Sequence, residues 1–141
     1  MSRDFTRRQI NMDSITVGIE PTGLARIILT FKADDHMAEL MRRVLMRLEP
    51  VVDVEVIDLD RSIVREVALL KTNKLSDKQM WDVVREVEKA GGRVLESKGG
   101  VLIAELSGGH EDIEKVIRSL GPKVLKEVAR SGQVLISREI N

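Results

Sequence analysis

The feature that most constrains the fold is a pattern of strands and helices that runs through the chain twice. The second copy, residues 61–141, reads as strand, helix, strand, strand, helix and strand. The first copy, residues 1–60, begins with a short helical stretch at 2–10 and continues as strand, strand, helix and strand. The full order is βαββαβ, the split-βαβ or ferredoxin-like arrangement. The sequence therefore predicts an α+β fold of two ferredoxin-like modules, with domains at 1–60 and 61–141, the N-terminal one lacking its first strand.

Alternating apolar residues define the strands of the first copy. Ile15, Val17 and Ile19 alternate with polar or small residues, which indicates a strand with one packed face. Residues 21–23 have turn chemistry and 24–32 form a returning strand, so the pair is predicted to be a hairpin. Asp34 is expected to cap a helix that carries an apolar stripe, and valines at 52, 54 and 56 predict a third strand over 51–59.

Stronger boundary signals define the second copy. Residues 64–72 are almost continuously apolar, which is typical of a central strand. Ser76 and Gln79 fit a capping box at the start of a helix that ends at two glycines, 91 and 92. Strands at 93–97 and 101–106 follow, joined by a turn at 98–100. The next helix is interrupted at Gly121, Pro122 is expected to begin a further helical segment to residue 130, and 134–137 form the final strand.

Composition excludes several classes of function. The 141 residues are 43% apolar and 33% charged, which fits a globular protein, and they contain no cysteine for a disulfide or thiol nucleophile. Basic and acidic residues balance at 23 each, whereas a nucleic-acid partner usually leaves a basic excess, so no nucleic acid is expected. No apolar run approaches the ~20 residues of a membrane span. No apolar signal core begins the chain, so a cytoplasmic location without a membrane partner is predicted.

Few residues are candidates for chemistry. His36 and His110 lie near predicted helix starts without a third histidine, so they are interpreted as solvated residues, with no metal or cofactor expected. Residues 107–109 before a helix are interpreted as a loop and cap. Asn11 stands where a helix passes into a strand and has two interpretations. It can be a helix C-cap, or its amide can address the amino and carboxylate groups of a small ligand.

Four segments resemble the regulatory small subunit of acetohydroxyacid (acetolactate) synthase, an ACT-domain family. The first, residues 7–18, includes Arg7-Arg8, Asn11 and Ser14 through Gly18, and matches the family's Arg-Arg/Gly-x-Asn-Ile-Glu/Asp-Ser-Leu/Ile-x-Val-Gly pattern. Residues 24–27 resemble the family's hairpin return, and 54–59 with 64–71 its domain junction. Residues 127–138 resemble its closing signature. The likeness covers nearly the whole chain in order.

The resemblance implies a function without catalytic residues of its own. Members of the family carry an N-terminal ACT domain and a C-terminal ACT-like domain with a ferredoxin fold. They bind the large, thiamine-diphosphate-dependent subunit, raise its activity and usually confer feedback inhibition by valine or another branched-chain amino acid. The effector typically lies between two N-terminal ACT domains, which implies a homodimer. Asn11 matches the family's effector-binding asparagine and Gly18 a small residue near the same site, so these two are the candidate effector-binding residues.

One departure from the family affects the N-terminal module. The first strand, the following turn and the start of the first helix have no counterpart, and Met1 aligns inside that helix. Without the first strand, segments 24–32 and 51–59 lose a shared neighbour and leave unpaired edges. Three explanations stay open: a partner chain supplies the pairing, the half rearranges, or the true start lies upstream.

The predicted function is therefore a non-catalytic regulatory subunit of a thiamine-diphosphate-dependent transferase, acetolactate synthase, in branched-chain amino-acid biosynthesis. The alternative is a stand-alone amino-acid-binding ACT module that regulates a different enzyme or a transcription factor. An independent enzyme and an RNA-binding protein rank below both.

Overall fold

The computed structural model describes residue 3 and residues 10–140. The helix predicted at 2–10 therefore falls mainly outside the described residues. The chain divides into two compact units, Met1–Ile63 together with Leu135–Asn141, and Val64–Val134. The predicted domains at 1–60 and 61–141 remain a proposal. In the described part of the chain, no helix is long and apolar enough to cross a membrane.

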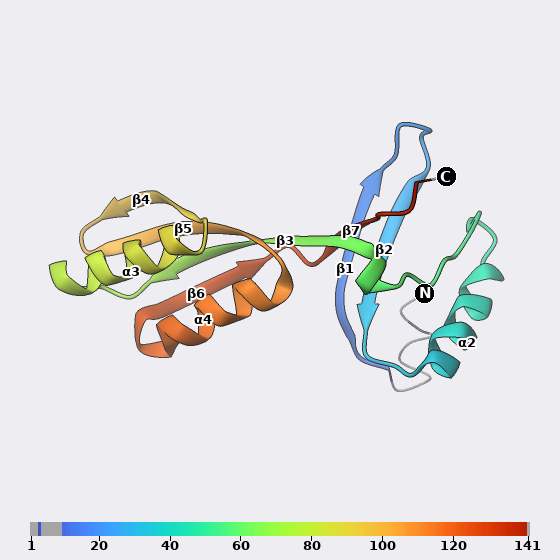
Figure 1. Ribbon diagram of the computed structural model, residues 1–141, viewed down its shortest axis with the longest axis horizontal. Coiled ribbons are helices and arrows are strands. Elements are labelled where there is room, and N and C mark those ends of the chain that lie inside the picture. Colours follow the sequence, from blue (N-terminus) through green and yellow to red (C-terminus); the bar gives the residue numbers. More distant parts are fainter. Residues whose placement is uncertain (1–2, 4–9, 141) are drawn as a thin grey trace. The chain divides into compact units, whose positions relative to one another are not determined.

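The N-terminal unit is built on the predicted hairpin. Strands β1 (Met12–Ile19) and β2 (Ala25–Phe31) pair antiparallel, with Ile15 opposite Leu29 and Val17 opposite Ile27 (Figure 1). Gly23 adopts a φ of 90°, a left-handed conformation that favours glycine, and its amide donates to the Glu20 carbonyl at 2.8 Å. The alternation of apolar residues thus predicted both the strands and their turn.

Helix α2 (Asp35–Met46) covers part of this hairpin. The Asp34 carboxylate accepts a hydrogen bond from the Met37 amide at 2.7 Å, so the predicted N-cap is confirmed. Met41 and Leu45 are buried on the inner face of the helix. They pack with half-buried side chains from both strands of the hairpin, among them Met12, Leu29 and Phe31.

The third strand predicted over 51–59 does not form in the described structure. Residues 51–58 have no regular secondary structure, and a short 3-10 helix, η1 (Leu59–Arg61), follows. Val54 still packs against the Met41 cluster, while Val52 and Val56 are exposed. Alternating valines favour an extended backbone, but a strand also needs a hydrogen-bonding edge, which this segment does not find among the described residues.

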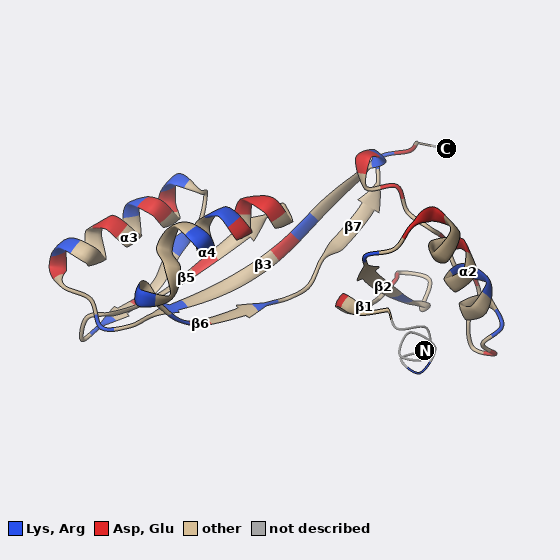
Figure 2. Cartoon of the chain, turned by 90° about the horizontal axis from the view of Figure 1, so that it is seen from below, with Lys and Arg blue, Asp and Glu red and all other residues tan. Residues whose placement is uncertain are grey.

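The C-terminal unit contains a sheet with two helices on one face. Strands β3 (Ser62–Thr72), β4 (Arg93–Lys98), β5 (Val101–Gly108) and β6 (Leu125–Arg130) lie in the order β4-β5-β3-β6. Strand β7 (Val134–Ser137), whose residues from Leu135 on are assigned to the N-terminal unit, also pairs with β3. Helices α3 (Asp77–Lys89) and α4 (His110–Val124) cover the same face (Figure 2). This α+β arrangement is the predicted ferredoxin-like ACT fold, with β3-α3-β4-β5-α4-β6 as its βαββαβ order.

Strand β3 shows how the helices shape the burial pattern. Ala68, Leu70 and Thr72 are buried toward the helices, whereas the intervening Val67 and Leu69 are partly exposed on the opposite face. The buried residues belong to a cluster that includes Val83 and Val87 of α3, Leu106 of β5 and Ile113 of α4. The near-continuous apolar run thus places apolar side chains on both faces of the sheet. In the described structure, helices cover one of these faces.

The two glycines after α3 have different physical roles. Gly91 has a φ of 82°, the left-handed conformation of a helix C-terminus. Gly92 has no positive φ, but a Cβ there would lie 2.5 Å from the Glu105 carbonyl oxygen and 2.5 Å from Leu106 Cδ2. Glycine at 92 therefore allows the backbone to approach strand β5 closely. The capping box at the other end of α3 is confirmed, with Gln79 N to Ser76 Oγ at 3.3 Å and Ser76 N to Gln79 Oε1 at 2.9 Å.

The prediction for 122–130 was wrong. Gly121 breaks the helix with a φ of 75°, Pro122 continues helical geometry only to Val124, and residues 125–130 form strand β6. This strand, and not 134–137, is the fourth strand of the ferredoxin-like order. Its leucine, lysine, glutamate, alanine and arginine favour a helix. Pairing with β3, in which Val128 lies opposite Leu70, overrides that local preference.

Candidate functional site

The two predicted effector residues lie at opposite ends of strand β1. Asn11 immediately precedes Met12, and Gly18 is the last residue but one of the strand; both are exposed. At about 3.3 Å per strand residue, their Cα atoms are roughly 20 Å apart. One chain therefore does not bring them together around a single small molecule, and their roles in effector binding stay a proposal.

Open space surrounds Gly18. It lies opposite Arg26 in the hairpin register, and a Cβ at position 18 would meet no atom within 4 Å. Arg26 forms an ion pair with Glu20 at the same end of the hairpin. In the described structure, packing therefore does not require a small residue at position 18. This end of the strand is accessible to solvent.

The hairpin presents an exposed apolar face. Val17 and Ile19 keep 64% and 73% of their surface, and Ile15 and Ile27 are also exposed. The register places Ile15 beside Leu29 and Val17 beside Ile27, and Leu29 packs against the Met41 cluster. The exposed face therefore continues the face that α2 covers. Contiguous exposed apolar side chains of this kind are frequent at the interaction surfaces of proteins.

A network of charged side chains lies inside the C-terminal unit. Glu66 of β3 has a side chain that is only 3% exposed, and the Arg130 guanidinium of β6 donates hydrogen bonds to it and to Glu114 of α4. His110, the first residue of α4, has its Nδ1 3.1 Å from Glu66 Oε1 and 3.0 Å from Arg130 Nη2. The network connects two strands and a helix that are distant in sequence.

Hydrogen bonds between Arg130 and the carboxylates favour the charged forms of Glu114 and Arg130. The hydrogen bond from Arg130 lowers the pKa of the Glu114 carboxyl below its ordinary value. Burial lowers the pKa of the Arg130 guanidinium, but hydrogen bonds to Glu66 and Glu114 outweigh it, so that pKa is raised. A buried carboxylate such as Glu66 is costly without a partner, so Arg130 is the group that makes this position tolerable.

Two of the segments that carry the resemblance described above meet at this network. Glu66 belongs to the segment 64–71 and Arg130 to the segment 127–138. The adjacent residues also bond, because the Val67 amide donates to Ser131 Oγ at 2.9 Å and the Ser131 amide donates to the Val67 carbonyl at 3.0 Å. The motifs therefore secure the pairing of β3 with the chain after β6.

Sequence reasoning missed this network, although one signal pointed to it. In strand β3, Glu66 occupies a position that alternates with exposed residues and shares the helix-covered face with Ala68 and Leu70. A carboxylate on the buried face of a strand requires a cation, which sequence alone cannot locate. His110 was predicted to be a solvated residue; its side chain is partly exposed, but its ring contacts Glu66 and Arg130.

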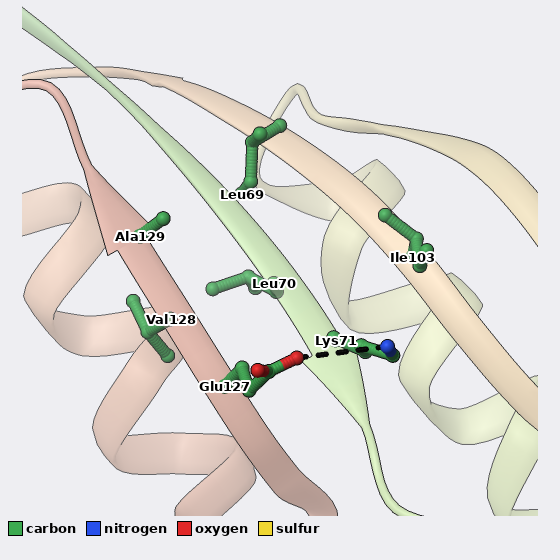
Figure 3. A pocket seen from close by; sticks show the side chains of 7 residues that line it. All are labelled: Leu69, Leu70, Lys71, Ile103, Glu127, Val128 and Ala129. Carbon is green, nitrogen blue, oxygen red and sulfur yellow. Dashed lines mark ion pairs between the residues drawn. The ribbon is translucent and has the colours of Figure 1, made fainter.

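The face of the C-terminal sheet away from the helices carries a shallow hollow. Its volume is about 420 Å³, and side chains from three strands line it, as Figure 3 shows: Leu69, Leu70, Lys71, Ile103, Glu127, Val128 and Ala129. Lys71 Nζ and Glu127 Oε2 lie 3.6 Å apart within it. The hollow has mainly aliphatic walls and one ion pair. Among residues 10–140 no three His, Asp or Glu side chains are grouped to hold a metal ion.

Comparisons with known proteins assign the chain to a class and then to a family. The fold is that of a small α+β protein of the ferredoxin-like, ACT-type class. The family model described as "Small subunit of acetolactate synthase" matches residues 65–139. The chain belongs to the acetolactate synthase small-subunit family.

Individual relatives cover most of the chain. It is 29% identical to a probable acetolactate synthase small subunit of Methanothermobacter thermautotrophicus over 135 residues, which are 95% of this chain and 80% of that protein. It is 30% identical to the acetolactate synthase small subunit of Mycobacterium leprae, over 95% of this chain and 79% of the relative. The crystal structure of the small subunit from Thermotoga maritima aligns with a TM-score of 0.87 and 31% identity, covering 99% of this chain and 88% of that one.

Proposed function

We propose that this chain is a regulatory subunit that assembles with the large, thiamine-diphosphate-dependent subunit of acetolactate synthase and raises its activity. The observation that carries the proposal is the likeness to a solved small subunit over 99% of this chain, with a TM-score of 0.87. A regulatory subunit acts by binding other proteins or ligands at its surfaces. A cytoplasmic location is part of the same proposal.

A homodimer through the N-terminal ACT domains is the second part of the proposal. The exposed face that contains Ile15, Val17 and Ile19 supports it, because burying such side chains is favourable at about 25 cal/mol per Å² of apolar surface. Val17→Asp is expected to shift the chain toward monomer in sedimentation experiments, because a carboxylate would have to be desolvated. Asp13→Asn, on the same strand, is the matched control. An unchanged oligomeric state of the Val17→Asp variant contradicts this part.

Addition of the chain to its cognate large subunit tests the regulatory function. The turnover of the large subunit in acetolactate formation is expected to rise and saturate at a fixed ratio of the two chains. Size-exclusion chromatography should show a complex at the same ratio. A large subunit whose rate and elution are unaffected by the chain would contradict the proposal.

Effector binding is the third part, with valine or another branched-chain amino acid as ligand. It is supported by the exposed Asn11 side chain, whose amide offers donors to a carboxylate and an acceptor to an ammonium group. Titration calorimetry with valine, leucine and isoleucine tests it. Asn11→Ala should weaken binding and Asp13→Ala, its exposed neighbour, should not. Absence of binding for all three amino acids leaves an activator without a sensor.

A further inference from the structure

One end of the C-terminal unit is assembled from three loops that hydrogen bonds tie together. The Asn73 amide donates to the Val124 carbonyl at 2.8 Å, and Asn73 Nδ2 donates to the Lys123 carbonyl at 3.1 Å. The Leu75 amide donates to the Gly100 carbonyl at 2.8 Å. The loop between β3 and α3 therefore holds both the β4–β5 turn and the junction of α4 with β6. Side chains on these loops share one surface.

That surface is rich in lysine. Segments 73–78, 98–101 and 121–127 carry five exposed lysines, here called the lysine end: Lys74, Lys78, Lys98, Lys123 and Lys126. None of the five forms an ion pair with the described residues. The same segments contain two carboxylates, Asp77 and Glu127, and Glu127 already pairs with Lys71. Blue segments mark this end of the unit, where α3 begins and α4 ends (Figure 2). In a chain of zero net charge, the excess is local.

An exposed tryptophan stands beside these lysines. Trp81 is the one tryptophan of the sequence, keeps 67% of its surface, and lies three residues after Lys78 on α3. Residues three apart on a helix share one surface. Val83 and Val87 face the core, so Trp81 has no part in it. Tryptophan is the side chain most enriched at the energetic centres of protein interfaces.

We propose that the lysine end and Trp81 form a docking surface for an acidic protein surface that offers an apolar pocket to the indole. The inference rests on the proposed function, by which the partner is the catalytic subunit. Lysine ammonium groups act as mobile point charges that attract an acidic partner over a distance, whereas phosphate recognition favours the fixed fork of arginine, which these segments lack. One exposed aromatic suits a single pocket better than a row of stacked bases.

Association kinetics of the full chain with its cognate large subunit test the proposal. The triple variant Lys74→Glu, Lys98→Glu, Lys123→Glu is compared with a control of equal charge, Lys32→Glu, Lys89→Glu, Lys115→Glu, whose lysines are exposed elsewhere. At low salt the first variant should associate about tenfold or more slowly than the wild type, and the control should stay within about twofold. The difference should vanish near 1 M salt, where the Debye length is about 3 Å.

Trp81→Ala gives an independent readout. Loss of an anchoring tryptophan should increase the dissociation rate about thirtyfold, with little change in the association rate. Circular dichroism and thermal unfolding of each variant show that it remains folded.

Each outcome has a distinct meaning. A wild-type chain that forms no complex overturns the proposed function, and this inference with it. A complex that forms equally fast with both triple variants, and dissociates equally slowly with Trp81→Ala, overturns the inference alone. A third outcome is that the wild type binds a single-stranded oligonucleotide, that only the Lys74→Glu, Lys98→Glu, Lys123→Glu variant loses this binding, and that this variant still forms the subunit complex normally. That result overturns the inference in favour of a nucleic-acid partner.

Discussion

The two units bury their apolar residues to different degrees. In the C-terminal unit, two helices close over a sheet, and ten buried apolar side chains of the described residues form one cluster. In the N-terminal unit, the described cluster has two buried members, Met41 and Leu45, while Val17 and Ile19 of the hairpin remain exposed. Both units follow the same alternation of strand residues. The difference shows that alternation creates an apolar face, whereas burial depends on a second layer that covers it.

The largest expected effect comes from the better-covered core. Leu70→Ala, at a side chain that is 1% exposed, should lower the free energy of unfolding by about 3 kcal/mol, because it leaves a cavity under α3 and α4. Val17→Ala on the exposed hairpin face should cost less than about 0.5 kcal/mol in the isolated chain. Urea unfolding followed by circular dichroism measures both. Equal costs in the monomer would break the comparison, whereas a cost of Val17→Ala that rises with protein concentration would reflect the proposed homodimer, which covers the hairpin face.

The second effect concerns how each unit pairs its charges. Arg130→Leu leaves the buried Glu66 without its cation and should cost about 3 kcal/mol. Arg43→Leu is the matched control in the N-terminal unit, because Arg43 pairs with Glu39 near solvent and should contribute much less than Arg130. The double variant Glu66→Gln, Arg130→Leu should recover part of the loss. No recovery would mean that packing of the arginine stem, and not its charge, stabilises the unit.

A third test compares the helix caps. Asp34→Ala and Ser76→Ala each remove a side-chain acceptor from a helix N-terminus and should each cost about 1 kcal/mol. Hydrogen exchange of the amides in α2 and α3 measures the two costs separately. Equal costs for the two caps would sharpen the comparison, because they would show that the units differ in the burial of their cores and not in the capping of their helices. A much larger cost for Asp34→Ala would instead show that α2 depends on its cap.

The smallest effect is the pH dependence of Glu114. Arg130 lowers the folded-state pKa of this carboxyl below the ordinary value of 4.5. Its contribution is therefore fully present above pH 4.5 and is lost as the pH falls through the lower folded-state value. Below pH 4.5 the midpoint of thermal unfolding should fall more steeply for the wild type than for Glu114→Gln.

Glu39 is the control for that titration. A hydrogen bond from Arg42 lowers the pKa of the Glu39 carboxyl in the same direction, but the side chains of this pair on α2 are more exposed than those of Arg130 and Glu114. Salt should therefore remove the pH-dependent effect of Glu39→Gln more readily than that of Glu114→Gln. Identical slopes for the wild type and Glu114→Gln would contradict the assignment of the Arg130 pair.

Local signals were sufficient for much of the fold. The alternation around Ile15 and Val17 predicted the hairpin, and the Asp34 and Ser76 caps were predicted from residue type and spacing. These features depend on residues within one turn or one strand of each other. The resemblance to the small-subunit family, carried by four segments, was confirmed by the comparisons.

The errors arose where pairing over long sequence separations decides the structure. Residues 125–130 have helix-favouring side chains and became a strand because β3 pairs with them, whereas the valines at 52 and 56 found no such partner. The contact of Glu66 with Arg130 spans 64 positions, and neither residue alone indicates the other. The candidate site was therefore less predictable than the fold. Gly18 was predicted from the resemblance alone and Asn11 from its position together with the resemblance, and the structure places them at opposite ends of one strand.

The two glycines after α3 have a consequence for the range of sequences that this fold accepts. Position 91 is restricted by a backbone angle, so asparagine, which enters the left-handed region more readily than other residues, is its best substitute. Position 92 is restricted by space, since even a methyl group would lie 2.5 Å from the Glu105 carbonyl oxygen. In a saturation library selected for folded protein, position 91 should therefore accept a few residue types and position 92 only glycine. Two identical neighbours would thus differ in how freely they can change.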